Sequence, residues 1–325
     1  MLTIKKKLIS IYITKYFDQI KKSNKIKQTI KFSKTNKYYI IATKKKKGFF
    51  SLLLFVLNHL KFAKKKNLIP IIDMKNYQTL YNENKTIFGT KNSWEYYFKS
   101  INNKSLDEIY KSENFIFCED KNIITKNNKF NSSLKQVYNS YIKINKNILI
   151  KYNKNKSEIF KKKEKTLGIH FRGTDMKYSP GHPFPPSKKQ IKENINYLKK
   201  KYSLKKIFLV TEDINNFHFV MNNFKNLQIF HIKNFKTSKL KAFDINYRKF
   251  HKYKMGEEAL LNSFLLSNCD LVLSSQTGIS DFAKFINPKL KLIKINNGYN
   301  SESIFFSIFK WQFKNFLPKY LGGFS

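Results

Sequence analysis

The first third of the chain alternates short runs of strand-forming residues with one long apolar segment. Residues 37–43 (KYYIIAT) are β-branched and aromatic and predict a strand, and residues 49–66, after Gly48, are apolar enough for a buried helix. A second strand is expected at 68–74 (LIPIIDM). A strand, a helix and a strand in this order form a βαβ unit, whose strands pair in parallel. The first part of the chain is therefore expected to be α/β.

The pattern is less regular in the middle of the chain. Residues 89–101 hold a cluster of aromatic side chains beside Glu95, which we interpret as a helix packed by its aromatic face. Residues 132–152 carry apolar side chains near helical spacing. From 153 to 165 this periodicity gives way to charged residues, which indicates a linker between two domains.

Short apolar runs and amphipathic segments alternate again in the second half. Strands are expected at 166–171, 205–213, 227–232, 270–275 and 289–296, and helices at 185–202, 215–224, 256–269 and 279–286. The polar stretch 233–254 is expected to be irregular. This alternation predicts a doubly wound parallel sheet, and such sheets bind ligands at the carboxyl ends of their strands.

The length of 325 residues suits two domains of roughly 150 residues each, with a cleft between them. We place an N-terminal α/β domain at 1–160 and a C-terminal α/β domain at 161–325. Packing of the last helix against the first domain is left open. Apolar residues make up 41% of the chain, enough for buried cores, so a globular protein is expected.

The formal net charge of +43 is a weak indicator of a partner. Lys, Asn, Ile, Phe and Tyr share A/T-rich codons and are all abundant, so codon bias explains much of the charge. A nucleic-acid-binding protein concentrates basic residues on one element with aromatic residues between them, whereas the runs at 44–47, 64–66 and 161–163 are scattered. Nucleic-acid binding stays open as an alternative, and the charge also permits peripheral contact with an anionic membrane.

The cysteine count and the apolar runs bear on the compartment. Cys118 and Cys269 are far apart and lack partners at zinc spacing, which argues against a disulfide framework and a structural metal and favours the cytoplasm. The longest apolar run, 48–60, is too short to span a bilayer, and segment 1–17 has no signal-peptide cleavage site. A soluble protein is expected.

Polar residues of a consistent kind lie where three strands of the second half end. They are Arg172, Thr174 and Asp175 at the first strand, Thr211, Glu212 and Asp213 at the second, and Ser274, Ser275, Gln276, Thr277 and Gly278 at the third. The last group precedes a helix, whose N-terminus offers free backbone N–H groups and a favourable dipole to a phosphate. The sequence therefore predicts an anion- and nucleotide-binding rim.

Arginine is rare in this chain, where nearly every cation is a lysine. Only Arg172 and Arg248 are present. The planar guanidinium matches phosphate oxygens in a way that an ammonium group does not, so the two arginines indicate positions that need this geometry. A salt bridge between Arg172 and Asp175 is the equally favoured alternative.

The segment GIHFRGTD, followed by GHPFPPSKKQI, resembles the first motif of the α1,6- and protein O-fucosyltransferase superfamily, which includes the bacterial nodulation fucosyltransferases. In that motif a strand ends in His-x-Arg-x-x-Asp, which His170, Arg172 and Asp175 match. IFLVTED and ALLNSFLLSNCDLVLSSQTGISDFAKFI are similar to the second and third motifs. The resemblance covers about residues 38–290 and implies the GT-B architecture, in which two Rossmann-like domains face a cleft.

The resemblance implies a metal-independent, inverting glycosyltransferase. The donor would be GDP-fucose or a related GDP-sugar, the acceptor a glycan, lipid-linked or protein group, and no cofactor or metal is required. An inactive relative that only binds nucleotide is a second alternative. Gly173 stands where the nodulation and α1,6 enzymes carry a second arginine.

The resemblance also suggests roles for individual residues. Arg172 would bind the diphosphate, and the other substrate-binding candidates are Gly48, His170, Asp175, His182, Glu212, Asp213, Ser274, Ser275, Gln276, Thr277 and Gly278. Asp73 and Glu95, on the first domain, are candidates for the catalytic base. Asp73 is equally suited to capping the next segment, Glu95 to pairing with a lysine, and Asp213 to capping a helix.

Overall fold

The computed structural model describes residues 37–112, 114–119, 129–162, 164–238 and 247–324. The N-terminal segment considered above as a signal peptide and Lys163 of the third basic run lie outside these residues. Residues 37–325 form one compact unit. None of the helices in the described ranges is both long and apolar enough to cross a bilayer.

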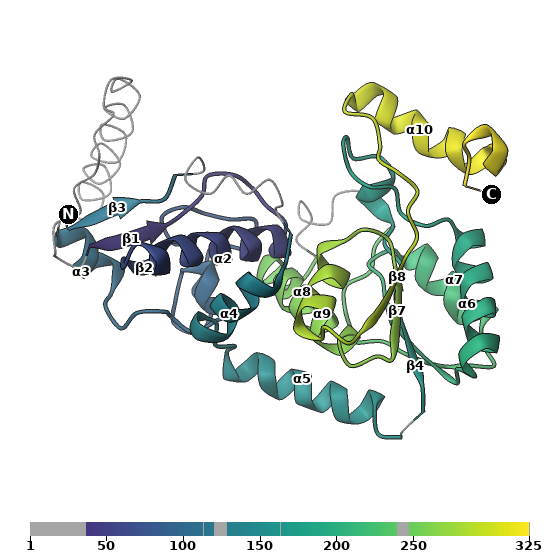
Figure 1. The fold of residues 1–325 in the computed structure, drawn as a ribbon, viewed down its shortest axis with the longest axis horizontal. Helices are drawn as coiled ribbons and strands as arrows, with labels where there is room; N and C mark the ends of the chain where they lie inside the picture. Colours follow the sequence, from purple (N-terminus) through teal and green to yellow (C-terminus); the bar gives the residue numbers. More distant parts are fainter. Residues whose placement is uncertain (1–36, 113, 120–128, 163, 239–246, 325) are drawn as a thin grey trace. The chain divides into compact units, whose positions relative to one another are not determined.

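The first half contains the predicted βαβ unit. Strands β1 (Tyr38–Ile41) and β2 (Ile69–Ile72) pair in parallel, and α2 (Phe49–Lys65) connects them (Figure 1). A third parallel strand, β3 (Phe115–Phe117), extends the sheet to the order β2-β1-β3. The sequence pattern gave no sign of β3, because three residues are too few to show a period.

The second half is the predicted doubly wound sheet. Its five parallel strands are β4 (Thr166–His170), β5 (Lys206–Val210), β6 (Gln228–Phe230), β7 (Leu271–Ser274) and β8 (Lys291–Lys294), in the order β6-β5-β4-β7-β8. The helices between them are α6 (Lys188–Tyr202), α7 (Ile214–Asn223), α8 (His251–Leu266) and α9 (Gly278–Ile286). The strand order reverses between β4 and β7, which is where open α/β sheets bind ligands.

Local sequence explains these elements. Every residue of β4, β5 and β7 is buried, as expected for parallel strands with helices on both faces. Helix α6 begins with a capping box, in which the Ser187 hydroxyl accepts from the Gln190 N–H while the Gln190 side chain accepts from the Ser187 N–H. Asp213 and Thr277 cap α7 and α9 with their side chains.

The remaining elements of the described residues are short helices and turns. They are η1 (Ser93–Tyr96), α3 (Leu106–Lys111), α4 (Ser132–Tyr141), α5 (Lys146–Ile159), η3 (Thr174–Lys177), α10 (Ile304–Phe316) and η5 (Lys319–Leu321). The helical pattern predicted at 132–152 is thus confirmed, although it is divided between α4 and α5.

Three sequence expectations are wrong in extent. The helix expected at 89–101 is only the turn η1, because Lys99 and Asn145 form backbone hydrogen bonds that join this segment to 143–145 in extended form. The aromatic packing expected there is present, since Trp94 is buried. The linker expected from 153 begins only after Ile159, which is buried at the end of α5.

The third expectation concerns α8. It begins at His251, within the stretch 233–254 that was expected to be irregular. His251 and Tyr253 carry polar groups, so the sequence shows no apolar pattern here, but both side chains are buried. Tertiary packing therefore stabilises this first turn.

The two halves contact each other through aromatic and polar side chains. The rings of Phe50 on α2 and Phe282 on α9 lie 4.7 Å apart. The Tyr97 hydroxyl donates to the Tyr253 carbonyl oxygen at 2.9 Å. The domain limits at 160 and 161 stay a prediction, although the two sheets lie on either side of them in sequence.

Candidate functional site

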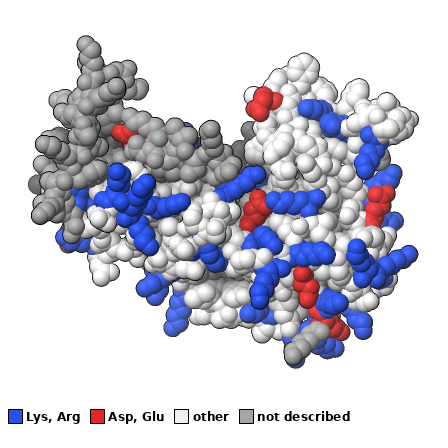
Figure 2. Space-filling model, in the orientation of Figure 1, with Lys and Arg blue, Asp and Glu red and all other residues white. Residues whose placement is uncertain are grey.

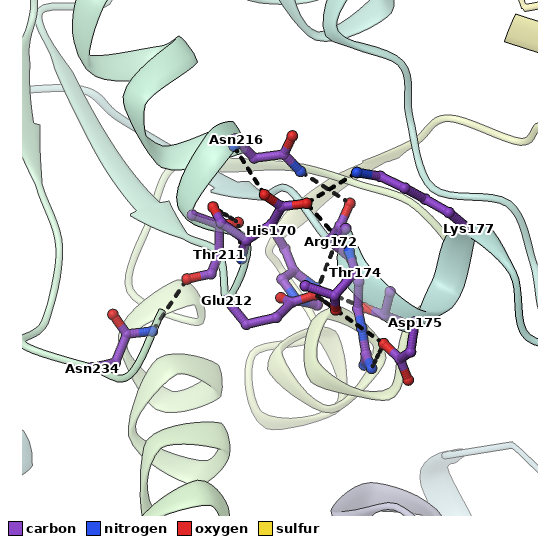
Figure 3. A network of polar contacts seen from close by, with 12 residues as sticks. His170, Arg172, Thr174, Asp175, Lys177, Thr211, Glu212, Asn216 and Asn234 are labelled. Carbon is purple, nitrogen blue, oxygen red and sulfur yellow. Dashed lines mark hydrogen bonds and ion pairs between the residues drawn. The ribbon is translucent and has the colours of Figure 1, made fainter. Parts of the chain in front are cut away.

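The carboxyl ends of β4, β5 and β7 bring the predicted rim residues together. Figure 3 shows Arg172, Asp175 and Glu212 joined by polar contacts with the loop that follows β4, with His170 beside them. Parallel pairing is the reason for this proximity: His170 pairs with Val210 of β5 on one side and with Ser274 of β7 on the other.

Arg172 is held by two carboxylates. Its Nη2 lies 3.2 Å from Asp175 Oδ1 and its Nε 3.5 Å from Glu212 Oε1. Burial lowers the pKa of the guanidinium, but these carboxylates outweigh it and raise the pKa. The side chain remains 31% exposed, and Nε makes no hydrogen bond to any described residue. The pair with Asp175, the equally favoured alternative to phosphate binding, therefore exists, and it leaves part of the guanidinium exposed.

The neighbouring acids shape the loop. Asp213 caps α7, accepts from the Thr174 N–H at 3.3 Å and pairs with Lys177 at 3.0 Å. Burial raises the pKa of the Asp213 carboxyl, but Lys177 and the backbone donors outweigh it, so the pKa is lowered. Glu212 accepts from the Gly173 N–H at 3.0 Å. These contacts favour the helix-capping alternative for Asp213 over direct substrate binding.

Two serines at the end of β7 have buried hydroxyl groups without a hydrogen-bond partner among the described residues. They are Ser274 and Ser275, which are both fully buried. Buried polar groups are nearly always paired, so these hydroxyls are suited to ordered water, and a ligand would reach them only if the surrounding side chains moved. Gln276 accepts from the Tyr299 hydroxyl at 2.6 Å.

His170 links β4 to the start of α9. Its Nδ1 lies 2.8 Å from Thr277 Oγ1, and Thr277 in turn accepts from the Ser280 N–H as the helix cap. Burial, with the nearby charge of Arg172, lowers the pKa of His170 from 6.5 to about 3. The imidazole is therefore neutral in the folded protein near pH 7 and acts as a positioning group for the α9 N-terminus.

This burial predicts a pH dependence of stability. The unfolded chain protonates His170 near its ordinary pKa of 6.5, whereas the folded chain does so only near 3. Acid therefore favours the unfolded chain, and His170 makes the free energy of unfolding fall by up to about 1.4 kcal/mol per pH unit as the pH drops from 6.5 toward 3. Urea unfolding at pH 6.5 and 5.0 should show a smaller drop for His170→Gln than for the unmodified protein.

Removing a histidine elsewhere provides the control for this experiment. His182 has an exposed side chain, so His182→Gln should keep the pH dependence of the unmodified protein. An equal drop in the unmodified protein and the His170→Gln variant would contradict the burial argument.

The start of α2 approaches the rim from the first half. A side chain at Gly278 would lie 2.9 Å from Phe50 Cβ, so the α9 N-terminus and the first turn of α2 are in close contact. Tyr81 lies close to the Phe49 backbone and to the charge of Arg172, and each of these lowers the pKa of its hydroxyl. Burial has the larger effect, so the pKa is raised. Gly48, the candidate of the first half, caps α2 through its backbone.

A groove of about 970 Å³ begins beside this contact. Residues of both halves line it, among them Phe50, Ser51 and Lys135 from the first and Gln276, Gly278, Asp281, Lys294 and Tyr299 from the second. A groove between the halves, as expected for the GT-B architecture, is therefore present; Gln276 and Gly278 of the predicted rim line it, whereas Arg172, Asp175 and Glu212 do not.

Three predicted site residues lie apart from this network. Asp73 is fully buried and accepts four hydrogen bonds, from the Lys75 and Asn76 N–H groups, the Asn76 amide and the Tyr110 hydroxyl, which favours the capping alternative. Glu95 accepts from the Thr90 hydroxyl at 2.6 Å and lines a separate small pocket. No side-chain contact joins His182 to the network among the residues the structure describes.

Sequence reasoning missed Lys177 and Tyr81. Lys177 is one of very many lysines in the sequence. Only its position three residues after Thr174, where η3 ends, could have indicated that it belongs to the site. Tyr81 reaches the rim from the other half of the chain, and no local pattern indicates that. In the described part of the chain, no three His, Cys, Asp or Glu side chains are grouped so as to hold a metal ion.

Comparisons with known proteins agree with this geometry at the level of the fold. No protein-family model matches the chain, and no curated protein matches it in sequence. A crystal structure of the NodZ α1,6-fucosyltransferase soaked with GDP-fucose is similar, with a TM-score of 0.54 and 14% identity over 80% of this chain and 95% of that one. The fucosyltransferase NodZ from Bradyrhizobium gives 0.53 and 14% over 81% and 96%. The chain thus has the fucosyltransferase-like GT-B fold that the motifs implied.

Proposed function

We propose that this protein is a metal-independent, inverting glycosyltransferase that transfers fucose or a related sugar from a GDP-sugar to a glycan or another cell-surface acceptor. The observation that carries the proposal is the partly exposed guanidinium of Arg172, which follows β4, beside the paired strand β7, whose end carries the buried, unpartnered hydroxyls of Ser274 and Ser275. These strand ends lie at the strand-order reversal of a fold similar to NodZ, whose crystal structure was soaked with GDP-fucose.

The proposed chemistry requires stabilisation of a departing diphosphate. As the bond between the sugar and the β-phosphate breaks, negative charge builds on the phosphate oxygens. The exposed part of the Arg172 guanidinium donates to these oxygens, and the N-terminus of α9, held by His170 and Thr277, adds its dipole. Fixed donors of this kind supply positive charge without a metal ion, which supports metal independence.

The acceptor would approach through the groove between the halves. Inversion follows from a single displacement, in which the acceptor hydroxyl attacks the anomeric carbon opposite the departing diphosphate. Asp73 is fully engaged in hydrogen bonds, so the structure does not favour it as the base that removes the hydroxyl proton. Glu95 is likewise occupied by Thr90.

We place the proposed reaction in the cytoplasm, where thiols stay reduced. Neither Cys118 nor Cys269 is part of a disulfide, and burial raises the pKa of Cys269. Figure 2 shows lysines distributed over the visible face with acidic residues among them, instead of one basic stripe. This distribution gives no support to the nucleic-acid alternative.

Slow hydrolysis of the donor tests the proposal without a known acceptor. The purified protein should release GDP from GDP-fucose, with water as the acceptor, at the same rate with and without EDTA. Loss of release in EDTA and its recovery with Mg²⁺ or Mn²⁺ would contradict metal independence. Tight binding of GDP with no release over the spontaneous rate would favour an inactive, nucleotide-binding relative.

A further inference from the structure

Helix α10, near the C-terminus, is held by only a narrow strip of its surface. Ser307 and Trp311, one turn apart, are its buried residues. Trp311 packs on Phe184 and Phe324, with ring centroids 6.1 and 5.2 Å away, and the Ser307 hydroxyl donates to the Tyr178 carbonyl oxygen at 2.8 Å. The option that this helix packs on the first domain gains no support, because Tyr178 and Phe184 lie between β4 and α6 of the second half and Phe324 lies in the C-terminal segment itself.

The rest of α10 is apolar and exposed. Its exposed large side chains are Ile304, Phe305, Phe306, Ile308, Phe309, Phe313 and Phe316, followed by Tyr320 and Leu321 in the next turn. Phe305 is 66%, Phe313 68% and Phe316 88% exposed. A hollow of about 680 Å³ is bordered by Phe305, Phe306, Phe309, Phe313, Leu317 and Leu321. Soluble proteins rarely expose such a continuous apolar surface unless it contacts a partner or a membrane.

Basic residues flank this aromatic surface. Lys310 and Lys314 lie on α10 and Lys319 follows it, and residues 303–325 contain no Asp or Glu. Lys314 is fixed by donating to the Gly322 carbonyl oxygen at 2.8 Å, which holds its ammonium at the end of the helix. Figure 2 shows the surface over α10 as mainly uncharged, with lysines and an acidic side chain at its margins.

Charge complementarity favours an anionic lipid surface over a second copy of the chain as the partner of this aromatic surface. A second copy of the chain would bring another net charge of +43 to the contact, and that repulsion opposes self-association. An anionic lipid surface instead attracts the flanking lysines, while its interface accommodates aromatic rings. A helix of 13 residues is about 20 Å long, too short to cross the bilayer but suited to lying in its surface.

We propose that α10 is a membrane-docking helix that lies flat in the headgroup region of an anionic bilayer. Its phenylalanines insert among the acyl chains, Lys310, Lys314 and Lys319 contact lipid phosphates, and Ser307 and Trp311 keep the helix attached to the second half of the protein. This inference rests on α10 alone and is independent of the donor and the reaction proposed above.

Vesicle flotation tests this proposal with the full chain. The unmodified protein should float with phosphatidylcholine vesicles that contain phosphatidylglycerol and bind vesicles of phosphatidylcholine alone much more weakly. Phe309→Ser combined with Phe313→Ser should reduce the partition coefficient on anionic vesicles by at least about tenfold, because two exposed aromatic side chains no longer insert. Ile150→Ser, at a 56% exposed position on α5, is the matched control and should leave binding unchanged.

Three results would overturn the proposal. Equal flotation of the Phe309→Ser/Phe313→Ser variant would mean that dispersed lysines, not α10, bind the lipid. No flotation of the unmodified protein would exclude membrane docking. A dimer in light scattering that the same variant converts to a monomer, without lipid binding, would assign the surface to a second copy. Circular dichroism and a second pair, Phe305→Ser with Phe316→Ser, separate a loss of binding from a loss of folding.

Discussion

Replacing Gly173 by alanine is expected to lower the free energy of unfolding by about 2–4 kcal/mol and to remove most nucleotide binding. A Cβ atom at this position would overlap Asp213 Oδ2 and lie 2.6 Å from Asp213 Cβ and 2.8 Å from Asn216 Nδ2. Asp213 would have to move, and with it the cap of α7 and the ion pair to Lys177. Because the loop also carries Arg172, its displacement would misplace the guanidinium.

Gly48→Ala provides the matched control for this prediction. Gly48 is also a candidate site residue, but its φ of −63° suits any residue and a Cβ there would meet no atom within 4 Å. We expect its stability to stay within about 0.5 kcal/mol of the unmodified protein in urea unfolding. A Gly173→Ala variant as stable as Gly48→Ala, with intact GDP binding, would contradict the packing around residue 173.

The crowding at Gly173 also bears on the resemblance to nodulation and α1,6 enzymes. Their second arginine has no room here without displacement of Asp213 and Asn216. In this protein the positive charge of the loop therefore comes from Arg172 and from Lys177, which Asp213 already pairs.

Replacing Arg172 by alanine is expected to slow GDP release from GDP-fucose by at least about 10³-fold. The guanidinium is the exposed cation of the network, and its loss leaves the departing diphosphate with the helix dipole alone. It also leaves Asp175 and Glu212 without their shared cation, which makes the rim more repulsive to phosphate. Arg172→Lys restores the charge but not the two-pronged geometry, so it should recover only part of the rate.

The other arginine offers the control. Arg248 pairs with Glu258 at 2.6 Å and lies over the Phe235 ring, and Arg248→Lys can keep this single ion pair. Its rate of GDP release should match that of the unmodified protein. Full activity in Arg172→Ala, or an equal loss in Arg248→Lys, would contradict the role assigned to Arg172.

The elements that the sequence predicted well are those with strong local signals. Strands β4, β5 and β7 have apolar centres with polar residues only at their ends, apart from Gly168 in β4, and α6 carries a Pro-Ser start with a capping box. The elements that it missed depend on distant partners. The first turn of α8 is stabilised by burial of His251, and the extended segment near Phe98 is stabilised by pairing with Ile144.

The same distinction applies to the site. His170 and Ser274 end adjacent parallel strands and Arg172 lies two residues after His170, so their proximity could be predicted from the strands alone. The bond from His170 to Thr277 and the unpartnered serine hydroxyls require three-dimensional coordinates. Asp73 and Glu95 were chosen by chain topology alone, which cannot reveal that local donors already occupy their carboxylates.

The most direct test of a GDP-sugar site is the melting temperature of the unmodified protein with GDP, UDP, CMP and ADP in parallel. At a concentration of about 100 times the dissociation constant, a ligand stabilises the folded chain by roughly 2.7 kcal/mol, which raises the melting temperature by a few degrees. We predict this shift with GDP and little or none with the other three nucleotides. An equal shift with another nucleotide, or none with GDP, would contradict the proposed donor site.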